Sequence, residues 1–482
     1  MQARALNPLN DPVLTVAQTQ AAEQALINGG VSVDALMERA GQGAAEYIWR
    51  MAAGQSVTVL CGPGNNGGDG YVIAEVLRAR GLSVSVIAPD ASRTDAAANA
   101  CAAFQGNVKH DASGVKGHIL VDCLFGSGLT RGLSEENSAL LMGLTERHAK
   151  IVAIDMPSGV DSDSGAILSP VPVYDLTIAL GAWKWAHFMM PAAQYMGALE
   201  KVGIGLDVSI SDAFPPVLKL TRPQLSSPAP DAHKYTRGLV AIVAGAMPGA
   251  AMLAALAARN SGAGYVKLLS DGQDFAAPPD IVIDRSPLAE ALTDSRISSL
   301  LIGPGLGRDE TARKRLDTVL RSAGGGALTL DADALMLLEA AQWPDMKHEN
   351  CVMTPHAGEL SRLCETFLIP DGQSVFARKV FEVIELGKKT RATLIAKGPD
   401  TVLYHHNKGI VVSAPASSWL SVAGTGDVLS GIVAARLASG SDPLAAGSEA
   451  VWLHGEAARL AGCAFSALQL VDQLRAAYAR CL

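Results

Sequence analysis

One unit recurs along the whole chain: a short apolar strand, a loop rich in glycine or acidic residues, and then a helical segment. Alternation of strands with helices predicts parallel sheets covered by helices, and ligands of such sheets bind outside the carboxyl ends of the strands. We therefore expect an α/β fold whose function is carried by the loops that follow the strands. The units are expected at residues 56–60, 82–90, 118–128, 150–160 and 174–181, and again at 237–246, 249–269, 298–307, 325–335, 352–360 and 392–404.

A proline-rich segment separates the two series of units. Residues 211–231, SDAFPPVLKLTRPQLSSPAPD, hold five prolines and a cluster of serines, which is typical of a linker. A chain of 482 residues is also too long for one ordinary hydrophobic core. We expect two α/β domains, residues 1–212 and residues 224–482.

Charge and cysteine content argue against several functional classes. The net charge is −8 and the chain has no basic cluster, so we expect no binding to nucleic acid or to an anionic membrane. The 7 cysteines include no C-x-x-C pair, which argues against a disulfide framework and favours a cytoplasmic location. The N-terminus lacks the pattern of a signal peptide. The most apolar stretch, residues 176–190, holds Lys184 and His187, so we expect a buried strand and loop rather than a membrane span.

The first loop, CGPGNNGGDGY (residues 61–71), contains G-x-G-x-x-G between a strand and a helix, and Asp90 ends the next strand. This pattern is typical of a dinucleotide-binding Rossmann site. The loop also carries the polar side chains of Asn65, Asn66 and Asp69. Its glycines continue through Gly68 and Gly70, and we expect them to delay the start of the helix. The polar groups indicate contact with reacting or coordinating atoms. The alternative is a tight turn in which Asn and Asp act as caps.

Two further loops of the first domain, residues 121–132 and 154–159, place oxygen-bearing side chains just beyond strands. Because the ends of adjacent parallel strands meet at one edge of a sheet, we expect Asn66, Asp122 and Ser158 to lie close together. No His or Cys accompanies them, so a hard cation such as K⁺ or Mg²⁺ is favoured over zinc. Each of the three could instead cap its own helix.

The second domain carries its strongest signal in AGTGDVLSGIVAARL (residues 423–437). Consecutive backbone N–H groups of Gly424, Thr425 and Gly426, with a helix expected to begin near Val428, would form an anion-binding site. Asp427 lies at the mouth of this site, where a carboxylate beside phosphate would be unfavourable unless it accepts a proton. The alternative role of Asp427 is a helix cap. The chain has no G-x-x-x-x-G-K-[ST] P-loop.

Three other loops are expected to face this anion-binding site. Lys397 ends a strand in KGPDT (residues 397–401), where it can meet phosphate charge. In TPHAGE (residues 354–359), Thr354 is expected to be the N-cap of a helix and His356 to face the edge of the sheet. The third loop is GPGLG (residues 303–307), whose glycines allow close approach of the backbone to a ligand.

The motifs GPGNNGGDG, VDCLFGSG and IDMPSG together resemble the YjeF-type N-terminal domain of NAD(P)H-hydrate epimerases. The ordered series HKYTRG, GAMPGAA, GPGLG, TPHAGE, KGPDT and AGTGD resembles the ribokinase-like domain of ADP-dependent NAD(P)H-hydrate dehydratases. Together the motifs cover nearly the whole chain and resemble the family of fused, bifunctional repair enzymes. The resemblance implies a Rossmann-like three-layer α/β/α first domain and a ribokinase-like α/β second domain.

This resemblance implies two activities on a damaged dinucleotide. Water adds across a double bond of the nicotinamide ring of NADH or NADPH and gives R and S hydrates, NADHX and NADPHX. The first domain would interconvert the epimers, and the second would dehydrate the S form with ADP as co-substrate. The implied partners are therefore small molecules, and we expect a homo-oligomer. K⁺ is implied for the first domain and Mg²⁺ for the second.

The resemblance also implies roles for single residues. In the first domain, Asp155 would contact the hydrate and handle the proton of epimerisation, and K⁺ would be held by Asn66, Asp122 and Ser158. The other hydrate contacts would be Asn65, Asn66, Gly67, Gly68, Asp69, Gly126, Ser127, Gly128, Leu129, Thr130, Arg131 and Gly132. In the second domain, Asp427 would contact the hydrate as general base, in a pocket lined by Ala250, Gly305 and His356. The adenine nucleotide would be bound by Lys397, Gly398, Pro399, Asp400, Thr401 and Gly426.

Departures from the commonest family pattern at Tyr71, Cys123 and Ser127 remove no named functional side chain. Two other classes of protein remain open. A small-molecule kinase would share the ribokinase-like half and use the first domain as an accessory nucleotide-binding domain. A non-catalytic protein would use the first domain to sense a nucleotide. The complete set of loops in the first domain argues against the kinase, and the acids Asp155 and Asp427 at the strand ends argue against the sensor.

Overall fold

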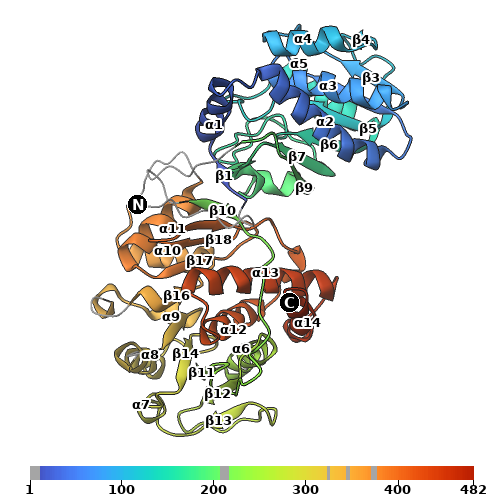
Figure 1. The fold of residues 1–482 in the computed structure, drawn as a ribbon. Helices are drawn as coiled ribbons and strands as arrows, with labels where there is room; N and C mark the ends of the chain where they lie inside the picture. The colour runs from blue at the N-terminus through green and yellow to red at the C-terminus, as the bar shows by residue number, and fades with distance from the viewer. Residues whose placement is uncertain (1–10, 207–215, 323–325, 344–347, 371–376) are drawn as a thin grey trace. The chain divides into compact units, whose positions relative to one another are not determined.

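The computed structural model describes residues 11–206, 216–322, 326–343, 348–370 and 377–482. Their packing defines two compact units, which we name the N-terminal unit (residues 11–206) and the C-terminal unit (the described residues between 216 and 370 and from 378 to 482). Each unit is built on its own largely parallel sheet with helices packed on it (Figure 1). The prediction of an α/β chain with two domains is confirmed.

The N-terminal unit has a parallel sheet in the order β4-β3-β2-β5-β6-β7-β9. The strands are β2 (Val57–Cys61), β3 (Val84–Ile87), β4 (Val108–Lys109), β5 (Gly117–Cys123), β6 (His148–Ile154), β7 (Leu176–Leu180) and β9 (Ala198–Val202). The helices are α1 (Val16–Asn28), α2 (Val33–Ala52), α3 (Asn65–Ala79), α4 (Asp95–Ala103) and α5 (Glu135–Thr145). A separate parallel pair joins β1 (Val13–Leu14) to β8 (Trp183–Lys184), which continues into the short 3₁₀ helix η1 (Trp185–His187).

Alternating side chains of the strands divide the core of this unit into two layers. Val59 and Val121 belong to the buried cluster that packs against α2 and α3, whereas Leu60 and Leu120 belong to the cluster that packs against α5. The sheet therefore lies between helices on both faces, as the predicted three-layer α/β/α domain requires. Because β2, β5 and β6 are neighbours, the residues that follow them meet at one edge of the sheet.

Helix α3 begins at Asn65, so the GGDG segment lies inside the helix and not in a loop before it. The prediction that these glycines delay the helix is wrong. They are needed for close packing, because a Cβ on Gly67 would lie 1.8 Å from the carbonyl oxygen of Gly62, and a Cβ on Gly70 would lie 2.8 Å from Cys61 Sγ. The glycines thus let the first turns of α3 approach the ends of β2 and β5.

We expect Gly67→Ala to lower the free energy of unfolding by about 3 kcal/mol, because the added methyl group would overlap backbone that cannot move aside. Gly64→Ala is the matched control, since a Cβ at this N-cap position of α3 has no heavy atom within 4 Å. Its effect should stay below about 1 kcal/mol. Chemical denaturation followed by tryptophan fluorescence measures both, and equal losses would contradict the packing role of Gly67.

The C-terminal unit has a sheet in the order β10-β19-β18-β17-β16-β15-β14-β11-β12-β13. The strands are β10 (Val217–Lys219), β11 (Leu239–Val243), β12 (Tyr265–Leu269), β13 (Val282–Asp284), β14 (Ile297–Ile302), β15 (Ala327–Leu330), β16 (Cys351–Met353), β17 (Thr393–Ala396), β18 (Val402–His405) and β19 (Gly409–Val412). Strand β18 is antiparallel to both of its neighbours, and the other pairings are parallel. Strand β10 pairs with β19, so part of the segment expected to be a linker belongs to this sheet.

Helices cover the C-terminal sheet in two groups (Figure 1). Helices α6, α12, α13 and α14 pack on one another and share the buried apolar clusters that contact the sheet. Helices α7 to α11 form the second group. Their bounds are α6 (Pro248–Asn260), α7 (Leu288–Ala291), α8 (Glu310–Ser322), α9 (Asp333–Leu337), α10 (Ala357–Thr366), α11 (Arg378–Thr390), α12 (Thr425–Ala438), α13 (Pro443–Ala461) and α14 (Ala467–Ala479).

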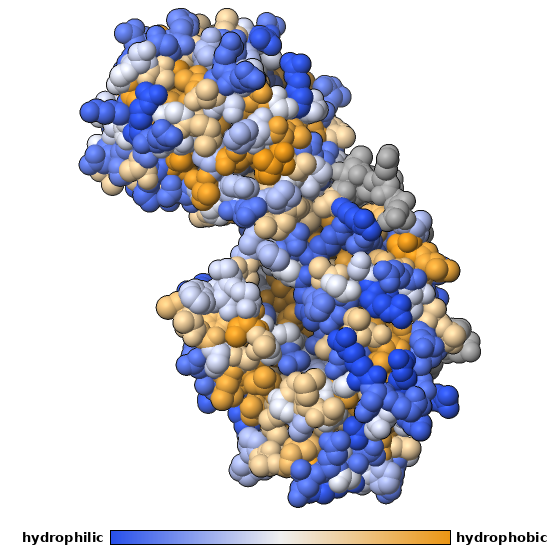
Figure 2. Space-filling view, turned by 180° about the vertical axis from the view of Figure 1, so that it is seen from behind, coloured by the Kyte–Doolittle hydropathy of each residue, from blue (hydrophilic) through white to orange (hydrophobic). Residues whose placement is uncertain are grey.

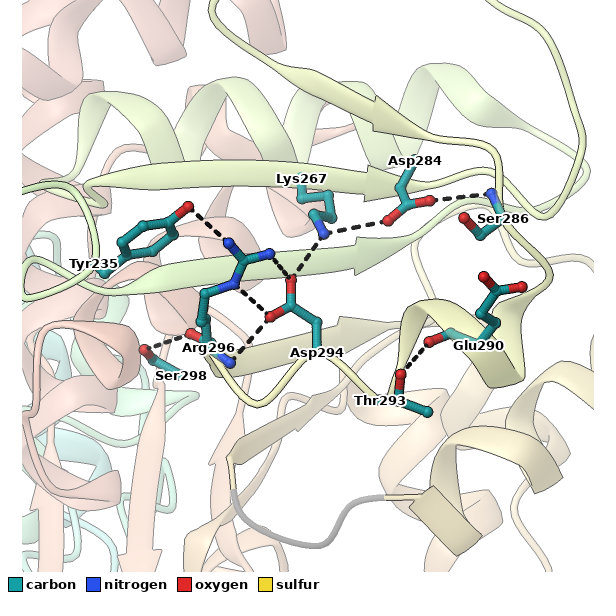
Figure 3. Close-up of polar contacts among 9 residues, drawn as sticks. All are labelled: Tyr235, Lys267, Asp284, Ser286, Glu290, Thr293, Asp294, Arg296 and Ser298. Atoms are coloured by element: carbon teal, nitrogen blue, oxygen red, sulfur yellow. Dashed lines mark hydrogen bonds and ion pairs between the residues drawn. The ribbon is translucent and has the colours of Figure 1, made fainter.

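A network of charged side chains fixes the β12–β13 edge of this sheet (Figure 3). Buried Lys267 of β12 is held by Asp284 at 3.2 Å and by Asp294 at 3.0 Å. Asp294 also pairs with Arg296, which donates to the hydroxyl of Tyr235 at 2.9 Å. A buried lysine requires such partners. The HKYTRG motif, which contains Tyr235, therefore takes part in this structural network.

Apolar residues on the surface are spread in small groups among polar residues over the visible face of each unit (Figure 2). Exposed apolar side chains of the C-terminal unit include Met247, Trp419 and Val422. No helix in the described part of the chain combines the length and the apolar character needed to cross a membrane.

Candidate active sites

The structure brings Asp122 and Ser158 together at the edge where β5 and β6 end. The Ser158 hydroxyl donates to Asp122 Oδ1 at 2.8 Å, and the Ser158 backbone N–H donates to Asp122 Oδ2 at 3.1 Å. Asp122 is fully buried and also accepts hydrogen bonds from Tyr174 Oη at 2.5 Å and from the Leu124 N–H at 3.0 Å. Burial raises its pKa, although these hydrogen bonds oppose the effect. Among the described residues, no Lys or Arg forms an ion pair with Asp122.

Asn66, the third residue of the predicted cation site, lies at the same edge of the sheet. Its amide nitrogen donates to the Ile154 carbonyl at 3.2 Å, and its amide oxygen accepts from the Gly126 N–H at 3.2 Å. Within the described residues it makes no direct hydrogen bond with Asp122 or Ser158. Asn66 therefore joins the end of β6 to the loop after β5.

Asp155, directly after β6, is paired with a lysine that our sequence analysis did not assign to the site. Lys184 Nζ contacts Asp155 Oδ1 and donates to the Leu180 carbonyl at 2.8 Å, and the lysine is only 1% exposed. Burial would raise the pKa of Asp155, but Lys184 and the hydrogen bond that the Ser127 N–H donates to Asp155 Oδ2 at 2.9 Å lower it overall. Asp155 is therefore held as a carboxylate.

The backbone of Asp155 adopts a left-handed conformation, with φ of 64°, which is uncommon for a residue other than glycine. Two contacts hold it there. The Asp155 N–H donates to Ile178 O at 2.8 Å, and His187 Nε2–H donates to Asp155 O at 2.9 Å. Burial and Lys184 lower the pKa of His187 to about 4, so this ring is neutral. The strained geometry is thus fixed from β7 and η1, and it aims the Asp155 carboxylate at the loop after β5.

The remaining predicted hydrate contacts of the N-terminal unit fall into two groups. Gly67, Gly68 and Asp69 are buried in the first turns of α3, whereas Asn65 is exposed and accepts a hydrogen bond from Thr94, the N-cap of α4, at 2.7 Å. The loop after β5 begins with Gly126 and Ser127 against Asp155, and it becomes exposed farther along. Its outer residues are Gly128, Leu129, Thr130, Arg131 and Gly132, of which only Leu129 is partly covered.

In the C-terminal unit, charged residues from four segments meet at the carboxyl edge of the sheet. Lys397 Nζ lies 2.8 Å from Asp331 Oδ1 and 3.8 Å from Glu359 Oε2. Asp331 is almost fully buried and also accepts a hydrogen bond from the Thr354 hydroxyl at 2.7 Å. Burial, and then Asp331, raise the pKa of Asp427 to about 7, although Lys397 lowers it. Asp427 can therefore exchange a proton near neutral pH.

Helix α12 starts at Thr425, three residues earlier than predicted, with Gly424 as its N-cap. Gly426 and Asp427 consequently lie in the first turn, where backbone N–H groups have no partner within the helix. Lys397 reaches this end, because a Cβ on Gly426 would lie 3.5 Å from Lys397 Nζ. On the opposite side, His454 of α13 bonds Thr425 O through Nε2 at 2.9 Å. The first turn of α12 therefore lies next to Lys397, and His454 fixes the carbonyl of its first residue.

The cap of α10 differs from the prediction. His356, not Thr354, is the N-cap: its Nδ1 accepts hydrogen bonds from the N–H groups of Gly358 and Glu359, at 3.0 and 3.3 Å. Thr354 instead binds Asp331. The His356 side chain remains 61% exposed. Loops after β11 and β14 lie against each other, since the Met247 N–H donates to Gly305 O at 2.9 Å and a Cβ on Gly305 would lie 3.0 Å from Ala250 Cβ.

The loop of residues 397–401 is anchored by Lys379 of α11, which the sequence analysis did not identify. Lys379 Nζ donates to Asp400 Oδ1 at 2.7 Å, to Asp400 O at 2.8 Å and to Lys397 O at 3.3 Å. Thr401 Oγ1 donates to Gly398 O at 2.8 Å and closes the turn, while Gly398 and Pro399 are exposed. Lys379 therefore sets the shape of the segment that the sequence analysis assigned to nucleotide binding.

We expect Lys379→Met to raise the KM for the nucleotide about tenfold with little change in kcat, since the loop loses three hydrogen bonds, worth about 1 kcal/mol or more in sum. Lys388→Met on the same helix is the control, because Lys388 is exposed and pairs with Glu385 of its own helix. Steady-state kinetics over a range of nucleotide concentrations would show the difference. A fall in kcat alone would contradict a role in shaping the loop.

Fold and sites together define an α/β protein in which each unit places a buried or half-buried acid and a lysine beside the ends of its strands. Comparison with known proteins agrees. A family model described as NAD(P)H-hydrate dehydratase matches residues 240–477, and one described as YjeF-related protein N-terminus matches residues 33–186.

Relatives of this chain match over both units. The bifunctional NAD(P)H-hydrate repair enzyme Nnr of Salinibacter ruber is 32% identical, over 95% of this chain and 93% of the relative. The enzyme of the same name from Escherichia coli is 32% identical, over 90% of this chain and 87% of the relative. Among solved structures, the ADP/ATP-dependent NAD(P)H-hydrate dehydratase from Bacillus subtilis, co-crystallized with ATP/Mg²⁺, is 25% identical with a TM-score of 0.47, over 56% of this chain and 100% of that chain. The chain belongs to the family of bifunctional NAD(P)H-hydrate repair enzymes.

Proposed function

We propose that the protein repairs hydrated NADH and NADPH by two reactions. The N-terminal unit epimerises the R and S hydrates, and the C-terminal unit dehydrates the S hydrate at the expense of ADP. The observation that carries the proposal is the pair of strand-end acids, an ionised Asp155 beside Lys184 and an Asp427 of pKa about 7 beside Lys397, in a chain that matches repair enzymes along both units.

Dehydration needs a leaving group better than hydroxide. Transfer of the terminal phosphoryl group of ADP to the hydroxyl of the hydrate would supply one: the O–H bond breaks, the proton passes to Asp427, and AMP leaves. Phosphate then departs as the ring nitrogen releases electrons and forms a C=N⁺ bond, and loss of a proton from the neighbouring ring carbon to solvent forms the C=C bond of the reduced nicotinamide. A carboxyl with a pKa of about 7 suits the acceptance of that proton, because about half of it is ionised at neutral pH. The N–H groups at the start of α12 and the Lys397 ammonium suit the charge that develops on the phosphoryl oxygens.

The nucleotide is proposed to lie along residues 397–401 and Gly426. Lys379 anchors this loop through Asp400, and Lys397 Nζ lies beside Gly426. Mg²⁺ would reach the site with the nucleotide phosphates. In the ranges that the structure describes, no group of three or more His, Cys, Asp or Glu side chains is arranged to hold a metal ion. The hydrate is proposed to lie against Ala250, Gly305 and His356, and exposed Met247 offers it apolar surface beside Gly305.

In the N-terminal unit, Asn66, Asp122 and Ser158 are proposed to hold K⁺. The amide, carboxylate and hydroxyl oxygens of these residues suit a monovalent cation. The Asp122 carboxylate is buried and has no Lys or Arg partner among the described residues, so a cation would supply the missing charge. K⁺ bound there would neutralise that carboxylate. Asp155 lies on the same loop as Ser158 and is proposed to exchange the proton of epimerisation.

The test is turnover of purified protein on a mixture of R and S hydrates, with and without ADP. We expect both epimers to disappear and the absorbance of reduced nicotinamide to recover only when ADP is present, with AMP and phosphate formed in equal amounts. Without ADP, the epimer ratio should still relax faster than in buffer. Phosphorylation of a sugar or of a hydroxymethyl-pyrimidine by ATP, with no recovery of the absorbance, would replace the proposal by a small-molecule kinase.

A further inference from the structure

A second carboxyl group, that of Asp69, interacts electrostatically with Asp155, and so far it has been assigned only a contact with the hydrate. Asp69 of α3 is 8% exposed, and its side chain makes no hydrogen bond or ion pair with the rest of the described chain. A buried carboxylate without a partner is costly, whereas a neutral carboxyl is much less so. Asp155, in contrast, has partners on both oxygens, namely Lys184, Ser127 and Leu180.

The position of Asp69 on α3 places it at the catalytic edge. Asn66 and Asp69 are three residues apart and share one side of the helix. Asn66 contacts Gly126, and a Cβ on Gly126 would lie 3.1 Å from Asp155 Oδ2. Asp69 and Asp155 therefore approach the same space from two different elements, α3 and the loop after β6.

A third carboxyl enters from the start of the chain. Strand β1 pairs with β8 with Leu14 opposite Lys184, and the Val16 N–H donates to Asp163 Oδ1 at 2.8 Å. These contacts hold α1 beside Lys184, and half-buried Glu23 of α1 interacts electrostatically with both Lys184 and Asp155. Helix α1, and Glu23 with it, lies outside residues 33–186, the part of the chain that the YjeF-related family model matches.

The charges of this cluster do not balance if every acid is ionised. One ammonium, Lys184, faces three carboxyl groups, Glu23, Asp69 and Asp155. Burial, and then the charges of Asp155 and Glu23, raise the pKa of Asp69 well above its usual range, while Lys184 lowers it less. The buried thiols Cys61 of β2 and Cys123 of β5 also face Asp69, whose charge contributes to raising their pKa. Two neighbouring acids whose environments give them different pKa values can act as a general acid and a general base.

We propose that Asp69 is the general acid of the epimerase reaction and that Asp155 is its base, an inference that rests on the proposed function. The carbon that bears the hydroxyl lies next to the ring nitrogen. Asp69 gives its proton to that hydroxyl, the C–O bond breaks, water leaves, and the nitrogen lone pair forms a C=N⁺ bond. A water molecule on the opposite face then forms a new C–O bond, Asp155 takes its proton, and the electron pair returns to nitrogen. Each turnover moves one proton from Asp69 to Asp155, and solvent exchange or the reverse turnover returns it.

Asp69→Asn in the full chain tests the role directly, because the amide keeps the size of the side chain and cannot donate an acidic proton. We expect epimerisation to fall by about 10²- to 10⁴-fold. ADP-dependent removal of the S hydrate should be unchanged, and the unfolding temperature should not fall, since no hydrogen bond is lost. Epimerisation at the wild-type rate would overturn the inference. Wild-type protein that neither epimerises nor dehydrates would instead overturn the proposed function.

Glu23→Gln gives a second test that does not depend on the stability of the Asp69 variant. A general acid must be protonated, so the wild-type epimerisation rate should fall as the pH rises through the pKa of Asp69. Removing the negative charge of Glu23 lowers that pKa, so this alkaline limb should move to lower pH in Glu23→Gln. An alkaline limb that does not move, or moves to higher pH, would overturn the inference.

Discussion

Asp427→Asn is expected to lower the rate of ADP-dependent dehydration by about 10²- to 10⁴-fold and to leave the exchange of R and S hydrates unchanged. Asparagine cannot take up the proton of the substrate hydroxyl, while the backbone of α12 that faces the phosphate is unaltered. Recovery of reduced-nicotinamide absorbance from an epimer mixture measures the first reaction, and chromatography of the epimers without ADP measures the second. Asp472→Asn, an exposed position on α14, is the matched control.

The pH dependence gives the same residue a second test. A base must be ionised, and the pKa of Asp427 is about 7, so kcat/KM for dehydration should rise with pH between about 6 and 8 and then level off. The charge of Asp331 is a principal cause of this raised pKa after burial. A dehydration rate that is flat across neutral pH, or an Asp427→Asn variant with wild-type activity, would contradict the assignment of the base.

The sequence predicted the sheets and the strand-end loops well, because these depend on local pattern. Apolar runs followed by glycine and acidic residues marked the ends of β2, β5 and β6 in one unit and the loops around Lys397 in the other. Parallel topology then brings such ends together, so the grouping of Asp122 with Ser158, and of Lys397 with the start of α12, could be expected before any coordinates.

Helix boundaries were predicted less well, for a physical reason. Glycine is unfavourable in helices by local propensity, so α3 and α12 were expected to start later than they do. In the structure, the glycines of α3 are retained in the helix because neighbouring backbone and side chains leave no room for a Cβ. Packing against neighbouring elements determines where these helices start, and this packing cannot be predicted from the local sequence.

One lysine of each site, Lys184 and Lys379, was missed for a related reason. Lys184 and Lys379 are far in sequence from the carboxylates they bind, Asp155 and Asp400, and neither lies in a glycine-rich motif. A signal was nevertheless present for Lys184. A lysine between two tryptophans in a run expected to be buried must find an anion, and Asp155 is the acid of the neighbouring strand-end loop.

The buried ion pair of Asp155 and Lys184 gives the second large expected effect, on both epimerisation and stability. Asp155→Asn should lower epimerisation by about 10²- to 10⁴-fold, so that in the presence of ADP the S hydrate is repaired and the R hydrate persists. The variant should also lose about 3–5 kcal/mol of stability, because Lys184, only 1% exposed, loses its ion-pair partner. Chromatography of the epimers, under conditions of slow spontaneous exchange, and chemical denaturation measure the two effects.

A double variant separates the two roles of Asp155. Asp155→Asn combined with Lys184→Met removes the unpaired charge, so most of the lost stability should return, because a buried ion pair replaced by apolar groups costs little. Epimerisation should stay as low as in the single variant, since the proton acceptor is still missing. Asp95→Asn, on the exposed first turn of α4, should change neither property. If epimerisation returned together with stability in the double variant, Asp155 would be a structural residue, and the proton would have to be accepted elsewhere.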